Sequence, residues 1–167
     1  PGGDVPRTEG VCTDVVVRSV RNAGMDLQKT LFEDIQRRTR AFPMIRKQPN
    51  PNIDHRRVKT LLPHFKPAWM ARSIAPRSRE DLWLPGDVLF MQTMGDKRPD
   101  HVGIVGERLG ASGLPVVINN WTDGSNTDEL DIFPYAPITH RFRIKTPRIQ
   151  VSPEGCGLQG VLARRGL

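Results

Sequence analysis

The spacing of apolar residues changes near residue 84, and this change limits the folds that the chain can adopt. Before that point, apolar residues recur three or four positions apart, which is the pattern of helices. After it, short runs rich in β-branched residues are separated by Gly, Pro and Asp, which is typical of strands. These runs predict strands over 87–92, 101–108, 115–120 and 138–144. Helices followed by strands indicate an α+β fold, with N-terminal helices packed on a small antiparallel sheet.

Three helices are predicted in the first half of the chain. The first covers 11–23 and is followed by Gly24, a residue suited to the C-terminal end of a helix. Asp26 can cap the second helix. The Pro-rich stretch 42–51 is expected to be a loop, and Asp54 is expected to cap a short third helix.

The length of 167 residues fits one domain with its own apolar core. We expect this domain to cover residues 1–146, followed by a C-terminal extension of unknown role, 147–167, that is rich in Gly and Arg. No apolar run approaches the roughly 20 residues that span a bilayer, so no membrane span is expected. We expect the protein to be a monomer. Because the chain begins at Pro1 rather than Met, we expect it to be a piece of a longer product.

The net charge of +7 and the pI near 10.1 favour a polyanionic partner, such as nucleic acid, an anionic membrane surface or a bacterial cell wall. Solubility alone is the other explanation of this charge. The basic residues are scattered along the chain, and the six Phe, three Trp and one Tyr form no stripe interleaved with them. Nucleic-acid binding is therefore not expected.

Two cysteines, Cys12 and Cys156, are too few for a disulfide scaffold and form no CxxC pair of the zinc-binding type. No metal site is expected, since the chain also lacks an HExxH motif. Cys12 lies at the predicted start of the first helix, where the helix dipole and free backbone N–H groups favour a thiolate. A thiolate there should react with alkylating reagents faster than Cys156. Position alone does not distinguish a nucleophile from a small buried residue.

His101 begins a predicted strand and follows a turn, which gives an imidazole base a rigid anchor. The other histidines are less well placed; they are His55, His64 and His140. The next strand ends in Asn119 and Asn120. An amide oxygen there can accept the second ring N–H of the base, as the third member of a Cys-His-Asn set. The alternative, in which the two Asn residues only end the strand before a turn, stays open.

Several segments together resemble the NlpC-type cell-wall cysteine peptidases of the papain-like group. In that family a nucleophile at a helix start precedes a Leu-x-Pro-Gly-Asp strand, a His-Val-Gly-Ile strand and a short strand with a polar third residue. The matching segments are Val11–Asp14, Leu82–Phe90, Asp100–Val105 and Val117–Asn119. The resemblance implies a papain-like fold, with Cys12 as nucleophile and His101 as base within hydrogen-bond reach of it. It places Asn119 third, where relatives often carry His, with Asn120 as the alternative.

The chain is more similar still to a bacterial family known only as a domain of unknown function in the same papain-like group. The similar segments are 2–6, 10–16, 26–28, 33–34 and 51–58. This similarity covers most of residues 1–146 and does not extend into the tail.

The resemblance implies hydrolysis of an amide bond in the stem peptides of bacterial peptidoglycan, without a cofactor. The expected substrate-binding residues are Asp14, Asp54, His55, Arg56 and Asn120. Arg56 is expected to pair with a stem-peptide carboxylate, although its segment can equally be a cap and helix start.

A cell-wall substrate implies a location in the periplasm or outside the cell. An antibacterial toxin opposed by an immunity protein would also fit a basic domain cut from a longer chain. Two alternatives use the same fold: a protein-directed thiol acyltransferase or deamidase, and a non-catalytic wall-binding module.

Overall fold

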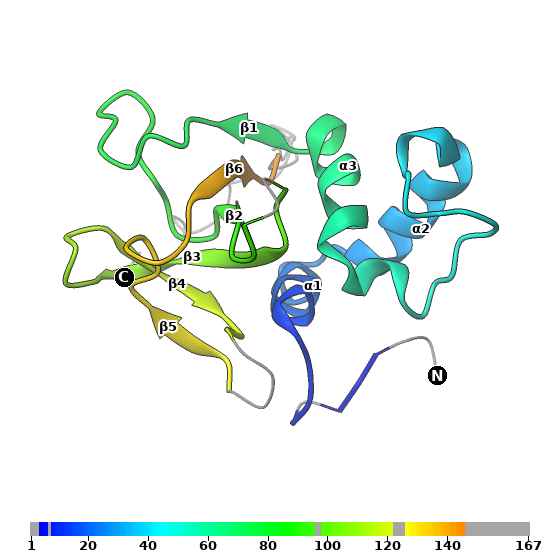
Figure 1. Ribbon diagram of the computed structural model, residues 1–167, viewed down its shortest axis with the longest axis horizontal. Coiled ribbons are helices and arrows are strands. Elements are labelled where there is room, and N and C mark those ends of the chain that lie inside the picture. Colours follow the sequence, from blue (N-terminus) through cyan, green and yellow to red (C-terminus); the bar gives the residue numbers. More distant parts are fainter. Residues whose placement is uncertain (1–3, 7, 96–97, 122–125, 146–167) are drawn as a thin grey trace, which may run out of the picture.

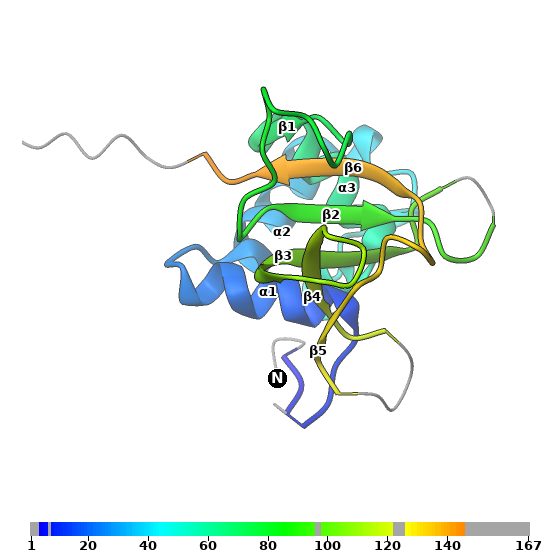
Figure 2. The ribbon, with the colours of Figure 1, turned by 90° about the vertical axis from the view of Figure 1, so that its left-hand side faces the viewer.

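Three helices lie on one face of a six-stranded sheet in the computed structural model, which describes residues 4–6, 8–95, 98–121 and 126–145 (Figures 1 and 2). The α+β prediction is therefore confirmed. The expected C-terminal extension, 147–167, and Cys156 lie outside the described residues. Among the described residues, no helix has the length and apolarity needed to cross a membrane.

The first two helices follow the predicted periodicity closely. Helix α1 covers Cys12–Asn22 and α2 covers Leu27–Arg37. Asp26 caps α2 as predicted, since its carboxylate accepts the backbone N–H of Lys29 at 3.1 Å. A short 3-10 turn at Thr39–Ala41 then leads into the loop expected over 42–51.

The predicted role of Asp54 as the cap of the third helix is wrong. Helix α3 begins later, at Val58–Ala68, and Asp54–Arg56 forms a separate 3-10 turn, η2. The carboxylate of Asp54 instead accepts the backbone N–H of Asn50 at 2.6 Å and pairs with Arg57 at 3.3 Å. Asp54 therefore holds the loop that enters η2.

All strand pairs of the sheet are antiparallel, in the order β1-β6-β2-β3-β4-β5. The strands are β1 Met70–Arg72, β2 Val88–Met91, β3 His101–Leu109, β4 Pro115–Asn119, β5 Asp128–Leu130 and β6 Ile138–Arg143. The four predicted strands correspond to β2, β3, β4 and β6. The two edge strands, β1 and β5, were not predicted, because three residues are too few to show an alternating pattern.

The sheet has apolar side chains on both faces, which is clearest in β2, where all four residues are buried. Val88 and Phe90 join the core beneath the helices, together with Val16, Leu31 and Phe65. The alternate residues of β2 face a second, smaller cluster on the other side of the sheet. This cluster includes Leu89, Met91, Val105, Val117, Ile132 and Trp83.

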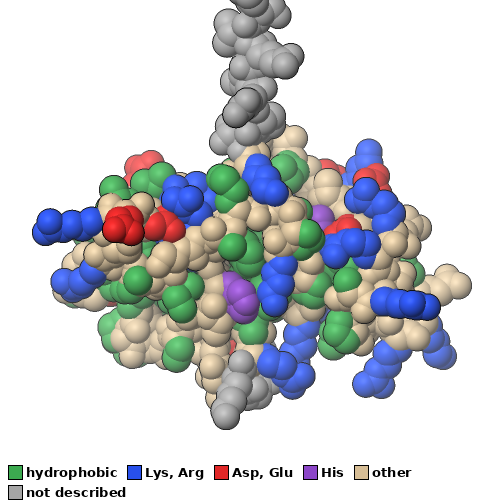
Figure 3. Space-filling view, turned by 90° about the horizontal axis from the view of Figure 1, so that it is seen from above, with side chains coloured by type: hydrophobic (Ala, Val, Ile, Leu, Met, Phe, Trp, Pro, Cys, Tyr) green, Lys and Arg blue, Asp and Glu red, His purple; other side chains and the backbone are tan. Residues whose placement is uncertain are grey.

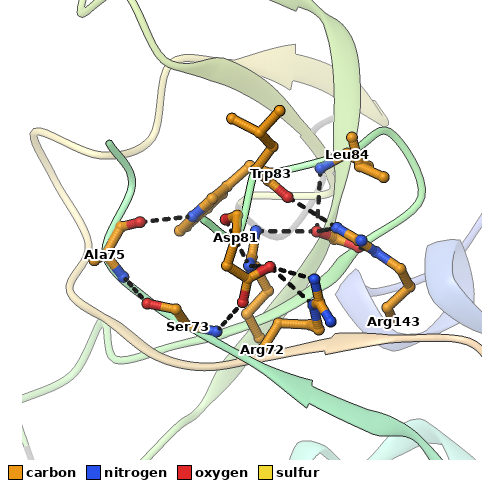
Figure 4. Close-up of polar contacts among 10 residues, drawn as sticks. Arg72, Ser73, Ala75, Asp81, Trp83, Leu84 and Arg143 are labelled. Carbon is orange, nitrogen blue, oxygen red and sulfur yellow. Dashed lines mark hydrogen bonds and ion pairs between the residues drawn. The ribbon is translucent and has the colours of Figure 1, made fainter. Parts of the chain in front are cut away.

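Buried ion pairs tie the long connection between β1 and β2 to strand β6 (Figure 4). Arg141 is fully buried and pairs with Asp81 at 2.6 Å and Asp87 at 3.2 Å. Arg143 contacts both carboxylate oxygens of Asp87, at 2.6 and 2.8 Å. Asp87 also accepts the backbone N–H of Leu84 at 3.2 Å. The Pro-Gly-Asp turn is thus a structural anchor for β2.

Candidate active site

Cys12 is the first residue of α1, so its backbone N–H is one of those that a helix start leaves without an intrahelical partner. Gly10, two residues earlier, has φ of +154°, and a Cβ there would lie 3.3 Å from Cβ and Oδ2 of Asp14. Any other residue at this position would therefore be strained on this path into α1. The same Asp14 oxygen accepts the backbone N–H of Val11 at 2.7 Å, which closes the first turn.

The thiol of Cys12 lies against strand β3, where it meets the backbone N–H of Val102. Burial raises the pKa of Cys12, and the nearby charge of Asp14 adds to this effect. The backbone N–H groups of Val102, Thr13 and Cys12 itself act in the opposite direction, but burial is the largest influence. The expectation of a resting thiolate at the helix start is therefore wrong in direction.

His101, the first residue of β3, forms a hydrogen bond with Asn119, the last residue of β4. His101 Nε2 lies 3.1 Å from Asn119 Oδ1, and both side chains are buried. The Nδ2 group of Asn119 donates to the carbonyl of Val117 at 2.9 Å, which turns Oδ1 toward the imidazole. Because an amide oxygen only accepts, Nε2 carries the proton of the neutral ring and Nδ1 keeps its lone pair. This arrangement suits Nδ1 to act as a base.

The surroundings of His101 favour its neutral form. Burial lowers the pKa of His101, while the bond to Asn119 and the charge of Asp100 raise it to a smaller extent. Trp121 packs edge-to-face on the imidazole, with the ring centroids 5.1 Å apart. Asp100 accepts the backbone N–H groups of Thr93 and Met94, each at 2.8 Å, which fixes the loop that leads into β3.

No direct hydrogen bond joins Cys12 to His101 in the part of the chain that the structure describes, so the expected contact is not made. Side chains alternate along β3, so that Val102 packs in the helix-side core and His101 on the other face. Cys12 approaches from the helix side and meets the backbone one residue after His101. Cys12 and His101 therefore lie on opposite faces of β3 near its first residues, and proton transfer between them requires a rearrangement of the site.

The expected substrate-binding residues bind one another or the backbone in this structure. Arg56 contacts both carboxylate oxygens of Asp14, with Nη2 3.0 Å from Oδ2 and Nε 3.1 Å from Oδ1. His55 is buried, and its Nδ1 lies 3.0 Å from the carbonyl of Pro51. The amide of Asn120 donates to the carbonyl of Gly10 at 3.4 Å.

A polar cavity of about 500 Å³ lies beside the start of α1. Its wall is formed by the segment that leads into Cys12, the first two turns of α1 and the end of β4. Gly10, Asp14 and Asn120 contribute to this wall, so two of the five expected substrate-binding residues do line a cavity. Asp54, His55 and Arg56 are not among the described residues that line it.

Two contributors to the site were not predicted from the sequence. Trp121 contacts the imidazole of His101, and its position directly after Asn120 was the only available signal. Gly103 allows β3 and β4 to approach closely, since a Cβ there would lie 2.6 Å from Cγ1 of Val117 and 3.1 Å from Cβ of Asn119. Its place in the His-Val-Gly-Ile segment was visible, but its contacts were not.

Comparison with known proteins gives a family without an assigned activity. No solved structure matches the chain. The chain is 34% identical over 151 residues to the uncharacterized protein YijF of Escherichia coli K12, covering 87% of this chain and 70% of YijF. The model of the domain-of-unknown-function family DUF1287 matches residues 1–144. The chain therefore belongs to the DUF1287 family.

Proposed function

We propose that this protein is a cysteine amidase of the papain-like, NlpC type that hydrolyses an amide bond in the stem peptides of bacterial peptidoglycan. Cys12 is the nucleophile, His101 is the base and Asn119 orients the base. The observation that carries the proposal is the His101–Asn119 hydrogen bond, which lies one residue along β3 from the Val102 N–H that the Cys12 thiol meets. The order along the chain, a nucleophile on a helix followed by a base and an amide on successive strands, matches the sequence resemblance.

The proposed reaction starts from a neutral thiol and a neutral imidazole, since burial raises the pKa of Cys12 and lowers that of His101. The thiol proton passes to Nδ1 of His101 as the sulfur attacks the amide carbon. Backbone N–H groups at the start of α1 stabilise the oxyanion. The C–N bond then breaks, and the imidazolium gives its proton to the leaving amine.

Water hydrolyses the thioester in the second half of the reaction. His101 takes a proton from the attacking water, and the acid product leaves as the thiol re-forms. Throughout, Nε2–H donates to Asn119, so the ring keeps the orientation in which Nδ1 exchanges the proton. Because Cys12 and His101 make no contact in this structure, the proposed reaction requires a rearrangement on substrate binding that brings the thiol to Nδ1.

The charge of the protein supports a wall substrate, which is polyanionic. Lys and Arg side chains are spread over the face seen in Figure 3, where acidic side chains are fewer. The cavity beside the start of α1 offers a polar surface for a peptide substrate; Val11 and Asp14 line it, whereas Cys12 is not among the described residues that do. Action on peptidoglycan places the protein in the periplasm or outside the cell, where an immunity protein would be the partner of a toxin.

The test is incubation of purified peptidoglycan with the wild-type protein and with Cys12→Ala, followed by mass spectrometry of the released fragments. New fragments from the wild type alone would support the proposal and identify the bond. Walls of several chemotypes should be used, because stem peptides differ among bacteria. Release by neither protein would instead favour a protein-directed transferase or deamidase, or a wall-binding module. Wall binding that survives Cys12→Ala would point to the last of these.

A further inference from the structure

The most tightly fixed charged pair near the proposed nucleophile is Asp14 with Arg56, which the reaction above does not use. Asp14 lies two residues after Cys12 and is only 4% exposed. Its two oxygens receive three contacts from Arg56, at 3.0, 3.1 and 3.3 Å. A charged carboxylate with this little access to water requires such a partner.

Hydrogen bonds hold the backbone around Arg56 in place. It ends η2, where Asp54 and His55 are buried and bind the loop before the turn. The hydroxyl of Thr60 donates to the carbonyl of Asp54, which ties η2 to helix α3. The guanidinium of Arg56 is therefore held by the helical layer, 42 positions away from Asp14 along the chain.

Asp14 transmits this constraint to the residue before the nucleophile. Its Oδ2 accepts the Val11 N–H at 2.7 Å and also the Arg56 Nη2–H at 3.0 Å. The side chain of Asp14 also lies against Gly10, where any Cβ would come within 3.3 Å. The backbone path into Cys12 is thus fixed by one carboxylate, which is itself fixed by Arg56.

We propose that Arg56 and Asp14 are positioning residues for Cys12. The carboxylate of Asp14 accepts the Val11 N–H and so sets the start of α1, and Arg56 neutralises this buried carboxylate. This inference rests on the proposed role of Cys12 as nucleophile. It assigns the Asn-Ile-Asp-His-Arg segment a role in preparing the thiol rather than in binding substrate.

The pair has an electrostatic consequence that a purely structural clamp would lack. The charge of Asp14 raises the pKa of Cys12, and a cation on Asp14 offsets that charge. Among the influences on the pKa of Cys12, Asp14 is the charged group; the others are burial and the backbone N–H groups of Val102, Thr13 and Cys12 itself. Removing Arg56 should therefore raise the pKa of Cys12, whereas removing the charge of Asp14 should lower it.

The experiment measures, as a function of pH, the rate at which iodoacetamide alkylates Cys12. All variants carry Cys156→Ser, so that Cys12 is the one thiol in the chain. At any pH below the pKa of Cys12, the alkylation rate follows the thiolate fraction, which falls about tenfold when the pKa rises by about one. Arg56→Gln should slow alkylation at neutral pH about three- to tenfold, and Asp14→Asn should accelerate it by a similar factor. The double variant, which holds neither charge, should return to within about threefold of the parent rate.

Opposite signs for the two single variants are the required result. Slowing by both, or no change in either, would overturn the proposal, since loss of a structural clamp alone moves both in one direction. If Arg56→Gln does not fold, the direction in which Asp14→Asn changes the alkylation rate still tests the proposal. Arg56→Lys, which keeps the positive charge, should hold the pKa of Cys12 closer to the parent value. Alkylation needs no substrate, so absence of peptidoglycan cleavage by the parent would contradict the proposed function without affecting this test.

Discussion

Replacing Asn119 by Ala should slow amide hydrolysis about ten- to hundredfold. The variant removes the acceptor that lies 3.1 Å from Nε2 of His101, in a site where both side chains are buried. In the proposed reaction the imidazole becomes positively charged, so the lost bond is one to a charged donor, worth about 1.5–3 kcal/mol. With a factor of ten for about 1.4 kcal/mol, this loss corresponds to the stated range.

The assay is the initial rate of fragment release at substrate concentrations below saturation, which reports kcat/KM. The pH profile gives a second readout, because the Asn119 bond raises the pKa of His101. Without that bond, the acid limb of the profile should move to lower pH. Asn120→Ala is the matched control, because it leaves the His101–Asn119 bond in place. It removes a partly exposed hydrogen bond to Gly10 and should lower kcat/KM by no more than about threefold.

Two results would refute this reasoning. One is a folded Asn119→Ala variant that keeps more than half of the parent kcat/KM with an unshifted acid limb. The other is a larger loss of kcat/KM for Asn120→Ala than for Asn119→Ala, which would show that Asn120, and not Asn119, orients the imidazole. Circular dichroism and thermal melting of each variant separate these outcomes from unfolding.

Three further predictions concern stability. Gly103→Ala should lower the free energy of unfolding by about 1–3 kcal/mol, because its Cβ would lie 2.6 Å from a side chain of β4; urea unfolding measures this, and an unchanged midpoint would contradict it. Asp87→Ala should lower the free energy of unfolding by about 3–5 kcal/mol, because it removes the carboxylate that pairs with the buried Arg141 and with Arg143. A melting temperature close to that of the parent would contradict the role of Asp87 as an anchor of β2. Stability should also fall as pH drops below 6.5, because burial lowers the folded-state pKa of His64 below that ordinary value and the unfolded chain takes up the proton first. This contribution is complete above pH 6.5, and His64→Gln should flatten the dependence of the urea midpoint on pH.

Local patterns predicted the elements that are long enough to repeat. The helices α1 and α2 each cover eleven residues, so their apolar faces recur over several turns. The three-residue edge strands, β1 and β5, contain no such repeat. Asp54 was misplaced for a related reason: an Asp before an apolar run is typical of a helix cap, and nothing local shows that a 3-10 turn intervenes.

The residues of the candidate site were proposed from the sequence, but not all of their contacts could be. Cys12, His101 and Asn119 were named from their positions together with the family resemblance, and the structure joins the last two by a hydrogen bond. The pairing of Arg56 with Asp14 spans 42 positions and has no periodic signal. From the sequence, a carboxylate and a guanidinium near a proposed nucleophile are readily interpreted as substrate-binding groups. The structure shows instead that Asp14 and Arg56 form an ion pair with each other.

The pKa of Cys12 was predicted in the wrong direction because a sequence shows the helix start but not the strand packed against it. The same burial that keeps the thiol protonated keeps His101 unprotonated. In the proposed mechanism the charged pair therefore forms only during attack, and its formation in a region of low dielectric must be offset. The groups able to do so are already in place: the Val102 N–H faces the sulfur, and the Asn119 oxygen accepts from the imidazole. A substrate amide that excludes water from the site would strengthen both interactions, so the site should be least reactive toward small reagents and most reactive once it is filled.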